Sequence, residues 1–305
     1  MQKKINLYWS NLFVDKINNF GDILSPSIIK ELSGGKINLV SCSFTLYSFR
    51  GILYYIKQYL KLFQLKRIIK LFSGHFQHKI MAIGSIIHFS DNKTIVWGAG
   101  LIRRGDKIKG GNFLAVRGAV TQQRLKELGF KVPNVIGDPA LLLRRTYIKN
   151  IEPVYEYGII PHYADYKLVV EKLNIPNSKI LIIDVLTDDP YKVVDKIRLC
   201  KNILSSSLHG IIISHTYCIP AVWCKFSGNI GGDDSKFEDY LLSVNLEFYK
   251  PCEISNYEIL KSPKILLDKY KNVLLPDSDI IDKVCDNLLS VAPFNIKNKY
   301  IKVIL

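Results

Sequence analysis

The chain alternates short apolar runs with segments of helical spacing, and this alternation is the feature that most constrains its fold. In the first half, apolar runs that read as strands lie at residues 5–9, 79–83, 94–97, 113–116 and 134–136. Helical spacing occurs at residues 23–32 and 119–128, and Gly129 supplies a stop for the second helix. Strands separated by helices are typical of βαβ units, so we expect a parallel sheet.

A second alternating series starts near residue 157. Strands are predicted at residues 157–161, 179–184, 202–205 and 221–224, and helices at 165–173, 190–200 and 208–217. After about residue 245 the pattern becomes mostly helical, with predicted helices at 256–270 and 279–289. The chain therefore repeats one architecture and then ends in a segment of a different kind.

These patterns predict an α/β fold with two Rossmann-like, doubly wound domains that face each other across a cleft. The expected boundaries are an N-terminal domain at 1–150, a C-terminal domain at 151–250 and a helical appendage at 251–305 that can cross back to the first domain. In such sheets ligands bind at the carboxyl ends of the strands. We therefore look for functional residues in the loops that follow the strands.

Composition limits the class of protein. The 305 residues are 48% hydrophobic and 23% charged, as in a globular protein. The six cysteines form no C-x-x-C pair and the histidines no metal-binding spacing, so neither a metal site nor a disulfide framework is expected. Scattered cysteines make a reducing cytoplasm the simplest setting. No run of about 18 apolar residues occurs, which predicts no spanning helix.

About half of the excess positive charge of +15 lies between Glu31 and Asp91, where no acidic residue occurs, and much of it falls in a basic insertion at residues 47–72. Its apolar residues Leu53, Ile56, Leu60 and Phe63 follow helical spacing and its lysines are offset from them, which indicates an amphipathic basic helix. One interpretation is an ordinary helix with a solvated lysine face. Another is peripheral docking on the anionic inner face of a membrane, where each Lys or Arg contributes about 1 kcal/mol. No recognised nucleic-acid-binding module is present, so no nucleic acid partner is expected.

Five polar or glycine-containing loops follow predicted strands. In order they are NFGD (19–22), WGAG (97–100), VRG (116–118), IGDPALLL (136–143) and SSSLHG (205–210). Each loop alone is a weak signal, because a glycine after a strand also makes a simple tight turn. No G-x-G-x-x-G or Walker A sequence occurs, so the chain lacks the usual dinucleotide and P-loop motifs.

Taken in this order, and followed by Y-C-I-P-A-V-W and G-G-D-D-S-K-F-E-D-Y-L, these loops resemble the polysaccharide pyruvyl transferase family over residues 18–245. The resemblance implies a two-domain fold similar to the B-type glycosyltransferases. It also implies transfer of pyruvate from phosphoenolpyruvate to a sugar. No cofactor is expected, with phosphoenolpyruvate as the donor substrate.

This chemistry assigns expected roles to particular residues. The methylene carbon of the donor must be protonated while a sugar hydroxyl attacks, so we expect His209 and Asp22 as the acid and base. Arg117 is the best candidate to bind an anion of the donor. The remaining substrate-binding candidates line the same strand ends: Asn19, Gly21, Gly98, Gly100, Asp138, His162, Ser205, Ser206, Ser207, Leu208, Gly210 and Lys236.

Several of these residues have simpler interpretations. Asp22 can be a helix N-cap, Asp138 a turn former, and Arg117 a surface residue at a helix start. His215 is expected to be structural. Family members often carry arginine where this chain has Ser207, and Arg103, Arg104, Arg144, Arg145 or Lys236 can compensate for the missing charge.

The expected function is a cytoplasmic ketal pyruvyltransferase that acts on a glycan, lipid-linked and destined for a surface polysaccharide. A nucleotide-sugar-dependent glycosyltransferase on the same scaffold is the alternative. A third reading is a glycan- or membrane-binding protein without catalysis. Binding of a nucleotide diphosphate rather than phosphoenolpyruvate would distinguish the alternative enzyme.

Overall fold

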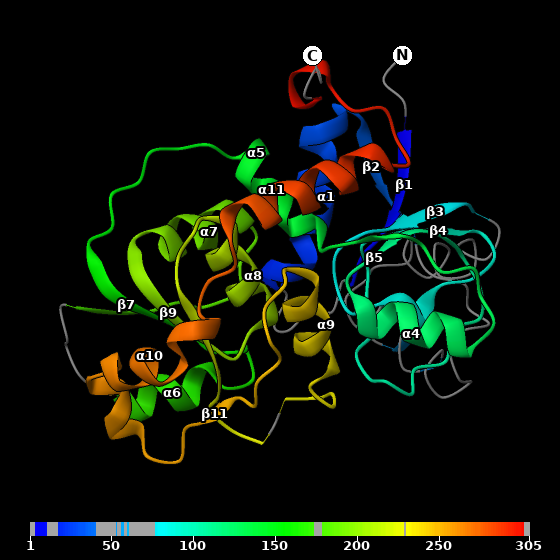
Figure 1. The fold of residues 1–305 in the computed structure, drawn as a ribbon. Helices are drawn as coiled ribbons and strands as arrows, with labels where there is room; N and C mark the ends of the chain where they lie inside the picture. The colour runs from blue at the N-terminus through cyan, green and yellow to red at the C-terminus, as the bar shows by residue number, and fades with distance from the viewer. Residues whose placement is uncertain are drawn as a thin grey trace.

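The computed structural model describes residues 4–10, 18–40, 53, 56, 57, 60, 77–173, 179–228 and 230–301. The first sheet contains six parallel strands in the order β2-β1-β3-β4-β5-β6 (Figure 1). They are β1 Lys4–Tyr8, β2 Lys36–Leu39, β3 Lys79–Met81, β4 Thr94–Trp97, β5 Asn112–Val116 and β6 Val135–Ile136.

The second sheet contains five parallel strands in the order β11-β10-β9-β7-β8. They are β7 Tyr155–Ile160, β8 Ile180–Ile182, β9 Cys200–Ser205, β10 Ala221–Lys225 and β11 Cys252–Glu253. Counted along the chain, both sheets begin with the order 2-1-3-4-5, which is a doubly wound arrangement. The order reverses between β1 and β3 in one sheet and between β7 and β9 in the other.

Helices cover both faces of each sheet, because successive side chains of a strand point in opposite directions. In the first domain these are α1 Phe20–Ser33 and α4 Ala119–Glu127, with the shorter helices η3 Ile87–Phe89, η4 Pro139–Leu142 and α5 Leu143–Thr146. In the second domain they are α6 Tyr166–Leu173, α7 Pro190–Arg198, α8 Leu208–Thr216 and α9 Ser235–Ser243.

The alternation divides the buried apolar residues into three clusters. Val96 and Val116 face an outer cluster beneath α4, and Ile159 and Leu204 face a second outer cluster beneath α6. The neighbouring residues of the same strands, such as Trp97, belong to a central cluster that also takes in α1, α7 and α8. The two domains therefore share one core between them.

The segment after residue 250 joins both domains. It holds η5 Tyr257–Lys261, α10 Lys264–Tyr270, η6 Lys271–Val273, α11 Ser278–Ser290 and η7 Asn298–Tyr300. In Figure 1, α11 passes from the second domain back toward the first, beside α5 and α1. There the indole of Trp97 donates a hydrogen bond to the carbonyl of Leu288 (2.9 Å).

This segment is mostly helical, as predicted, but it also contains one strand. The short strand β11 pairs with β10 as the edge of the second sheet, and Ile254 just after it is buried in the outer cluster. A two-residue strand leaves no alternation that a sequence pattern can detect. The strand β2 was missed in the same way, because its four residues are partly exposed and mixed in polarity.

Other predicted elements lie within a few residues of the observed ones. Gly129 has φ +78°, the left-handed conformation that ends α4 at the predicted place. The basic segment 47–72 lies outside the described residues except for Leu53, Ile56, Lys57 and Leu60, which are helical. Within the described part of the chain, no helix has the length and apolar character needed to cross a membrane.

Candidate active site

The predicted loops meet at the carboxyl edges of the two sheets. NFGD leads from β1 into α1, and SSSLHG leads from β9 into α8, so each lies beside the point where its strand order reverses. Backbone hydrogen bonds join the domains here: Phe20 N–H donates to the carbonyl of Val185 (2.8 Å), and Thr187 N–H to that of Asn18 (2.8 Å). The NFGD loop is thus held against the second domain.

Two of the three serines in SSSLHG make hydrogen bonds with backbone groups. The Ser205 hydroxyl lies within hydrogen-bond distance of the carbonyls of Ile160 (3.0 Å) and Ser207 (2.9 Å), and accepts from the Ser207 N–H (3.0 Å). Ser206 Oγ accepts from the His162 N–H (2.8 Å). These contacts fasten the end of β9 to β7. Ser207 is the N-cap position of α8 but its hydroxyl makes no capping bond, so it is the serine best placed to reach a ligand.

His209 occupies the contact between the domains. A Cβ built on Gly21 of α1 would lie 2.2 Å from His209 Nδ1, so only glycine at that position allows the ring to sit there. On its other side, Nε2 lies 3.9 Å from Oδ2 of Asp138, too far for a hydrogen bond. Both atoms are buried without a hydrogen-bond partner. Burial, followed by the charges of Arg117 and Lys236, lowers the pKa of His209 to about 3.

The predicted glycines are all points of close approach. A Cβ built on each glycine would lie too close to a neighbouring side chain. It would lie 2.2 Å from Pro139 at Gly98, 2.5 Å from Arg117 at Gly100, and 2.4 Å from Ser205 Oγ at Gly210. Gly98 also has φ +100°. Leu208 is the first residue of α8 and is buried. Packing alone therefore explains these glycines, and ligand binding by their N–H groups stays a prediction.

Arg117 is fully buried, not a surface residue. Its Nε donates to Asp239 Oδ2 on α9 (3.0 Å), Nη1 to Ser85 Oγ (2.8 Å), and Nη2 to the carbonyl of Leu101 (2.6 Å). Asp239 is equally buried and also accepts from the N–H and hydroxyl of Thr121 (2.9 and 2.6 Å). A donor anion would have to compete with Asp239 for this guanidinium.

Asp22 and Asn19 lie at the start of α1. Asn19 is the N-cap, and its side chain accepts from the Gly21 N–H (2.9 Å), so the capping role considered for Asp22 belongs to Asn19. Asp22 is partly accessible but surrounded by protein. Burial raises its pKa to about 7 against a lowering contribution from a hydrogen bond with Ser10. A carboxyl group with this pKa carries a proton near neutral pH.

Asp138 and Lys236 are two further ionisable groups whose pKa values are shifted by their surroundings. Asp138 caps η4 by accepting from the Ala140 N–H (3.0 Å), and burial raises its pKa to about 6. Lys236, in the first turn of α9, has no hydrogen bond or ion pair with any described residue. Burial and the charge of Arg117 lower its pKa to about 8. Burial and the charge of Lys236 lower the pKa of His162, which follows β7, to about 4.

The other candidate cations are committed elsewhere or exposed. Arg144 and Arg145 pair with Asp282 and Asp286, which lie on α11. Arg104 pairs with Glu238, and Arg103 is exposed. Lys236 is therefore the candidate that is partly buried and makes no hydrogen bond or ion pair with a described residue. His215 is structural, as expected: its ring nitrogens contact the Tyr240 hydroxyl and the Leu274 carbonyl (both 3.0 Å).

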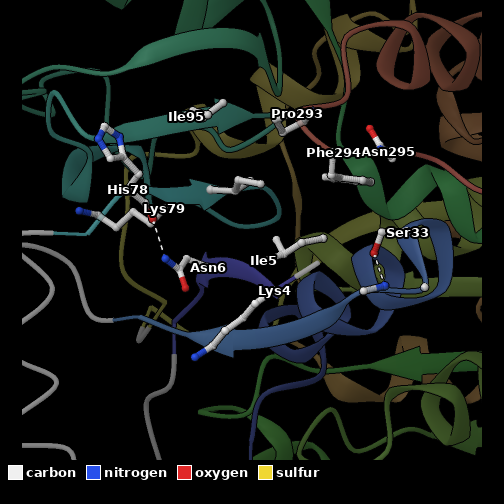
Figure 2. A pocket seen from close by; sticks show the side chains of 13 residues that line it. Lys4, Ile5, Asn6, Ser33, His78, Lys79, Ile95, Pro293, Phe294 and Asn295 are labelled. Atoms are coloured by element: carbon white, nitrogen blue, oxygen red, sulfur yellow. Dashed lines mark hydrogen bonds between the residues drawn. The ribbon is translucent and has the colours of Figure 1, made fainter. Parts of the chain in front are cut away.

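A hollow of about 450 Å³ lies at the opposite edge of the first sheet. Figure 2 shows its lining at the amino ends of β1 and β3, near Lys4, His78 and Phe294. None of the predicted site residues lines it. Ligands of doubly wound sheets bind at the carboxyl edge, so we place the candidate site there and not in this hollow.

Sequence reasoning missed the partners that fix the site, namely Asp239, Thr121, Ser85 and Ser10. Asp239 lies within the quoted G-G-D-D-S-K-F-E-D-Y-L segment, but nothing there links it to Arg117, 122 positions away along the chain. The other three are common residue types outside the quoted motifs. Among the described residues, no group of three or more His, Cys, Asp and Glu side chains could hold a metal ion.

Together these features define a two-sheet α/β protein whose site combines a buried histidine, a protonatable carboxyl and an unpaired lysine. Residues 18–227 match the family model described as polysaccharide pyruvyl transferase, and the chain belongs to this family of transferases. It is also 38% identical over 182 residues to a protein of Acanthamoeba polyphaga mimivirus described as "Uncharacterized protein L143". That match covers 58% of this chain and 62% of the relative. No solved structure matches the chain.

Changing Asp239 to Asn should strongly destabilise the protein, because it leaves the buried Arg117 charge unpaired. We expect a loss of about 3 kcal/mol in the free energy of unfolding, measured by urea denaturation. The neighbouring Glu238→Gln is the control, since its partner Arg104 is largely exposed and the expected loss is about 0–1 kcal/mol. Equal losses in both variants would contradict the role given to Asp239.

Gly21→Ala should displace the His209 ring. Helix propensity favours alanine, but overpacking against the imidazole should lower the free energy of unfolding by about 1–3 kcal/mol. Gly105→Ala is the matched control, because nothing lies within 4 Å of its added Cβ. A Gly21→Ala protein as stable as the wild type would show that the contact is not tight.

Asp22 should make stability depend on pH. Its folded pKa of about 7 lies above the ordinary 3.8, so the folded state holds the proton more tightly. Stability is therefore lost as pH rises from about 4 to about 7. Asp22→Asn should remove about 2 kcal/mol of this loss, a value reduced for partial exposure. Urea unfolding across that range tests this, with the exposed Asp279→Asn as control; an unchanged slope in Asp22→Asn would refute it.

Proposed function

We propose that this protein transfers pyruvate from phosphoenolpyruvate to a sugar of a surface-polysaccharide intermediate and forms a cyclic ketal. Family membership supports the reaction class. The observation that carries the proposal is the partly buried Lys236, which has no ion-pair partner among the described residues and whose charge helps to lower the pKa of the buried His209. An anionic donor would supply the missing partner. We also propose that the donor binds in a cleft between the domains, as in B-type glycosyltransferases.

Lys236 takes the place of the arginine expected at Ser207. A buried ammonium without a counter-ion is unfavourable, so an anion that enters its surroundings gains a strong interaction. The carboxylate or phosphate of phosphoenolpyruvate supplies that charge. The Ser207 hydroxyl and the positive end of α8 add hydrogen bonds to the same anion. Where Arg117 keeps its ion pair with Asp239, its guanidinium acts on the donor mainly through the electrostatic field of its charge.

The proton balance of ketal formation fits the two titratable groups. One sugar hydroxyl adds to the central carbon of the donor while its methylene carbon gains a proton and becomes a methyl group. Phosphate then leaves, and a second hydroxyl attacks the same carbon to close the ring. The two sugar hydroxyls lose two protons in all. One balances the proton gained by the methylene carbon, and the other leaves with the phosphate.

The shifted pKa values of Asp22 and His209 assign one of these proton transfers to each residue. Asp22, with a pKa of about 7, supplies the proton to the methylene carbon, and neutral His209 accepts the hydroxyl proton. A bound donor anion offsets the charges of Arg117 and Lys236, so it raises the pKa of His209 and lets the ring hold that proton. Separated acid and base values of this kind are typical of acid-base pairs in enzymes.

The acceptor is a glycan that we propose to be lipid-linked. The basic segment 47–72 would then place the enzyme on the anionic cytoplasmic face of a membrane. Four positions of that segment are described, and Leu53 and Leu60 are both substantially exposed, which supports an apolar face available for a membrane surface. The remainder of the proposed contact lies outside the described residues.

Incubation with phosphoenolpyruvate and glycan acceptors tests the function directly. We expect release of inorganic phosphate that requires acceptor, and a product heavier by one pyruvate less water. Thermal stabilisation by phosphoenolpyruvate should accompany it. Stabilisation by a nucleotide diphosphate instead, with no phosphate release from phosphoenolpyruvate, would favour a nucleotide-sugar glycosyltransferase and refute the proposal.

Lys236→Met should weaken donor binding more than it slows chemistry. Loss of one charge-assisted contact of about 2 kcal/mol raises the KM for phosphoenolpyruvate about 30-fold, with a smaller change in kcat. Lys201→Met is the control, because Lys201 lies exposed at the amino end of β9 and pairs with Glu156 (3.0 Å). An unchanged KM in Lys236→Met would remove Lys236 from the donor site and leave the overall function standing.

A further inference from the structure

Two cysteines lie side by side at the edge of the second sheet. Cys224 of β10 and Cys252 of β11 are register partners in neighbouring parallel strands. Strands in a sheet lie about 4.8 Å apart, and a disulfide accepts Cα separations of about 4.4–6.8 Å. Both side chains pack on the same apolar cluster, so they point to the same face of the sheet. The Cys224 thiol donates to the carbonyl of Val222 in its own strand (3.8 Å), and its interaction with the Cys252 thiol shifts the pKa values of both.

The environments of the two sulfur atoms differ in a useful way. Cys224 is fully buried, whereas Cys252 is partly exposed. The interaction with the Cys224 thiol, with help from the Lys269 charge and the Tyr270 hydroxyl, lowers the pKa of Cys252 to about 7. Burial raises the pKa of Cys224 well above its ordinary value. Cys252 is therefore the reactive thiol and Cys224 its protected neighbour.

We propose that Cys224 and Cys252 form a reversible thiol–disulfide site that responds to peroxides. The Cys252 thiolate attacks one oxygen of hydrogen peroxide and breaks the O–O bond, which gives a sulfenic acid and, with one proton, water. The Cys224 sulfur then displaces the hydroxyl group, which leaves as a second water with the Cys224 proton. The pair is oxidised by two electrons and the peroxide is reduced by two.

The position of the pair gives the bond a structural consequence. The residues that follow the two cysteines line a hollow of about 340 Å³ at the carboxyl ends of β10 and β11; they are Lys225, Phe226, Ser227, Gly228, Glu253, Ile254 and Ser255. Lys225 pairs with Asp234 (2.6 Å), the residue that precedes α9. A disulfide would join the two walls of this hollow at their base and fix the edge strand, which otherwise holds by a two-residue pairing.

The other described cysteines lack this arrangement. Cys218 is exposed and lies near Arg144 Nη1 (3.3 Å), and Cys200 and Cys285 are buried. None of these three is the register partner of another cysteine in the described strands. Cys218 therefore serves as the natural internal control, since it is more accessible than Cys252 but has no thiol neighbour in the described structure.

The test uses the full-length, reduced protein treated with hydrogen peroxide and digested without reduction. We expect a cross-linked peptide that joins Cys224 to Cys252 and is lost on addition of dithiothreitol. Before oxidation, Cys252 should react with iodoacetamide at neutral pH, and oxidation should slow that reaction at least about tenfold. Cys218→Ser should leave the cross-link intact, and Cys252→Ser should abolish it.

Several outcomes would overturn the proposal. These are a native protein in which Cys252 is oxidised only to sulfinic acid, a disulfide that uses Cys218 or another cysteine, or no cross-link while Cys252 stays alkylatable. The measurement on the wild-type protein decides the matter even if Cys252→Ser folds poorly. It does not depend on pyruvyl transfer, because its readout is the bond itself.

Discussion

The buried ion pair between Arg117 and Asp239 is the interaction on which the rest of the site depends. It joins the end of β5 in the first domain to α9 in the second, with neither side chain exposed to solvent. Separating these groups would leave two uncompensated charges in an apolar interior, which is strongly unfavourable. The pair therefore fixes the orientation of α9 and, through it, the position of Lys236 relative to His209.

Around that ion pair, one lysine lacks an ion-pair partner among the described residues. Arg117 is neutralised by Asp239, whereas the Lys236 ammonium lies 5.3 Å from the centre of the Phe237 ring. Burial raises the pKa of Asp138 to about 6 and lowers that of His209 to about 3. A lysine without an ion-pair partner favours an anionic ligand. This unpaired lysine supports the proposed binding of an anionic donor such as phosphoenolpyruvate.

The sequence predicted the local elements and the loops of the site, but not the contacts between domains. Strands such as β4 and β10 were found because buried strands in parallel sheets are nearly continuous apolar runs. His209 and Lys236 were identified because they lie in or after motifs at strand ends. The partnership of Arg117 with Asp239 could not be predicted, since it depends on how two separately wound sheets pack together. The serines were expected to be ligand donors, but Ser205 and Ser206 bond to the backbone at the end of the neighbouring strand β7. That contact depends on the strand order within the second sheet, which the sequence pattern does not give.

The central apolar cluster has a consequence for how the chain folds. Both sheets bury one face against the same layer, to which α1 comes from one domain and α7 and α8 from the other. Neither half can complete that layer alone, so a chain cut between the domains would expose an apolar surface on each piece. Formation of the second sheet therefore completes the buried interior of the first. Because the N-terminal half is synthesised first, its apolar face stays uncovered until the second half has folded.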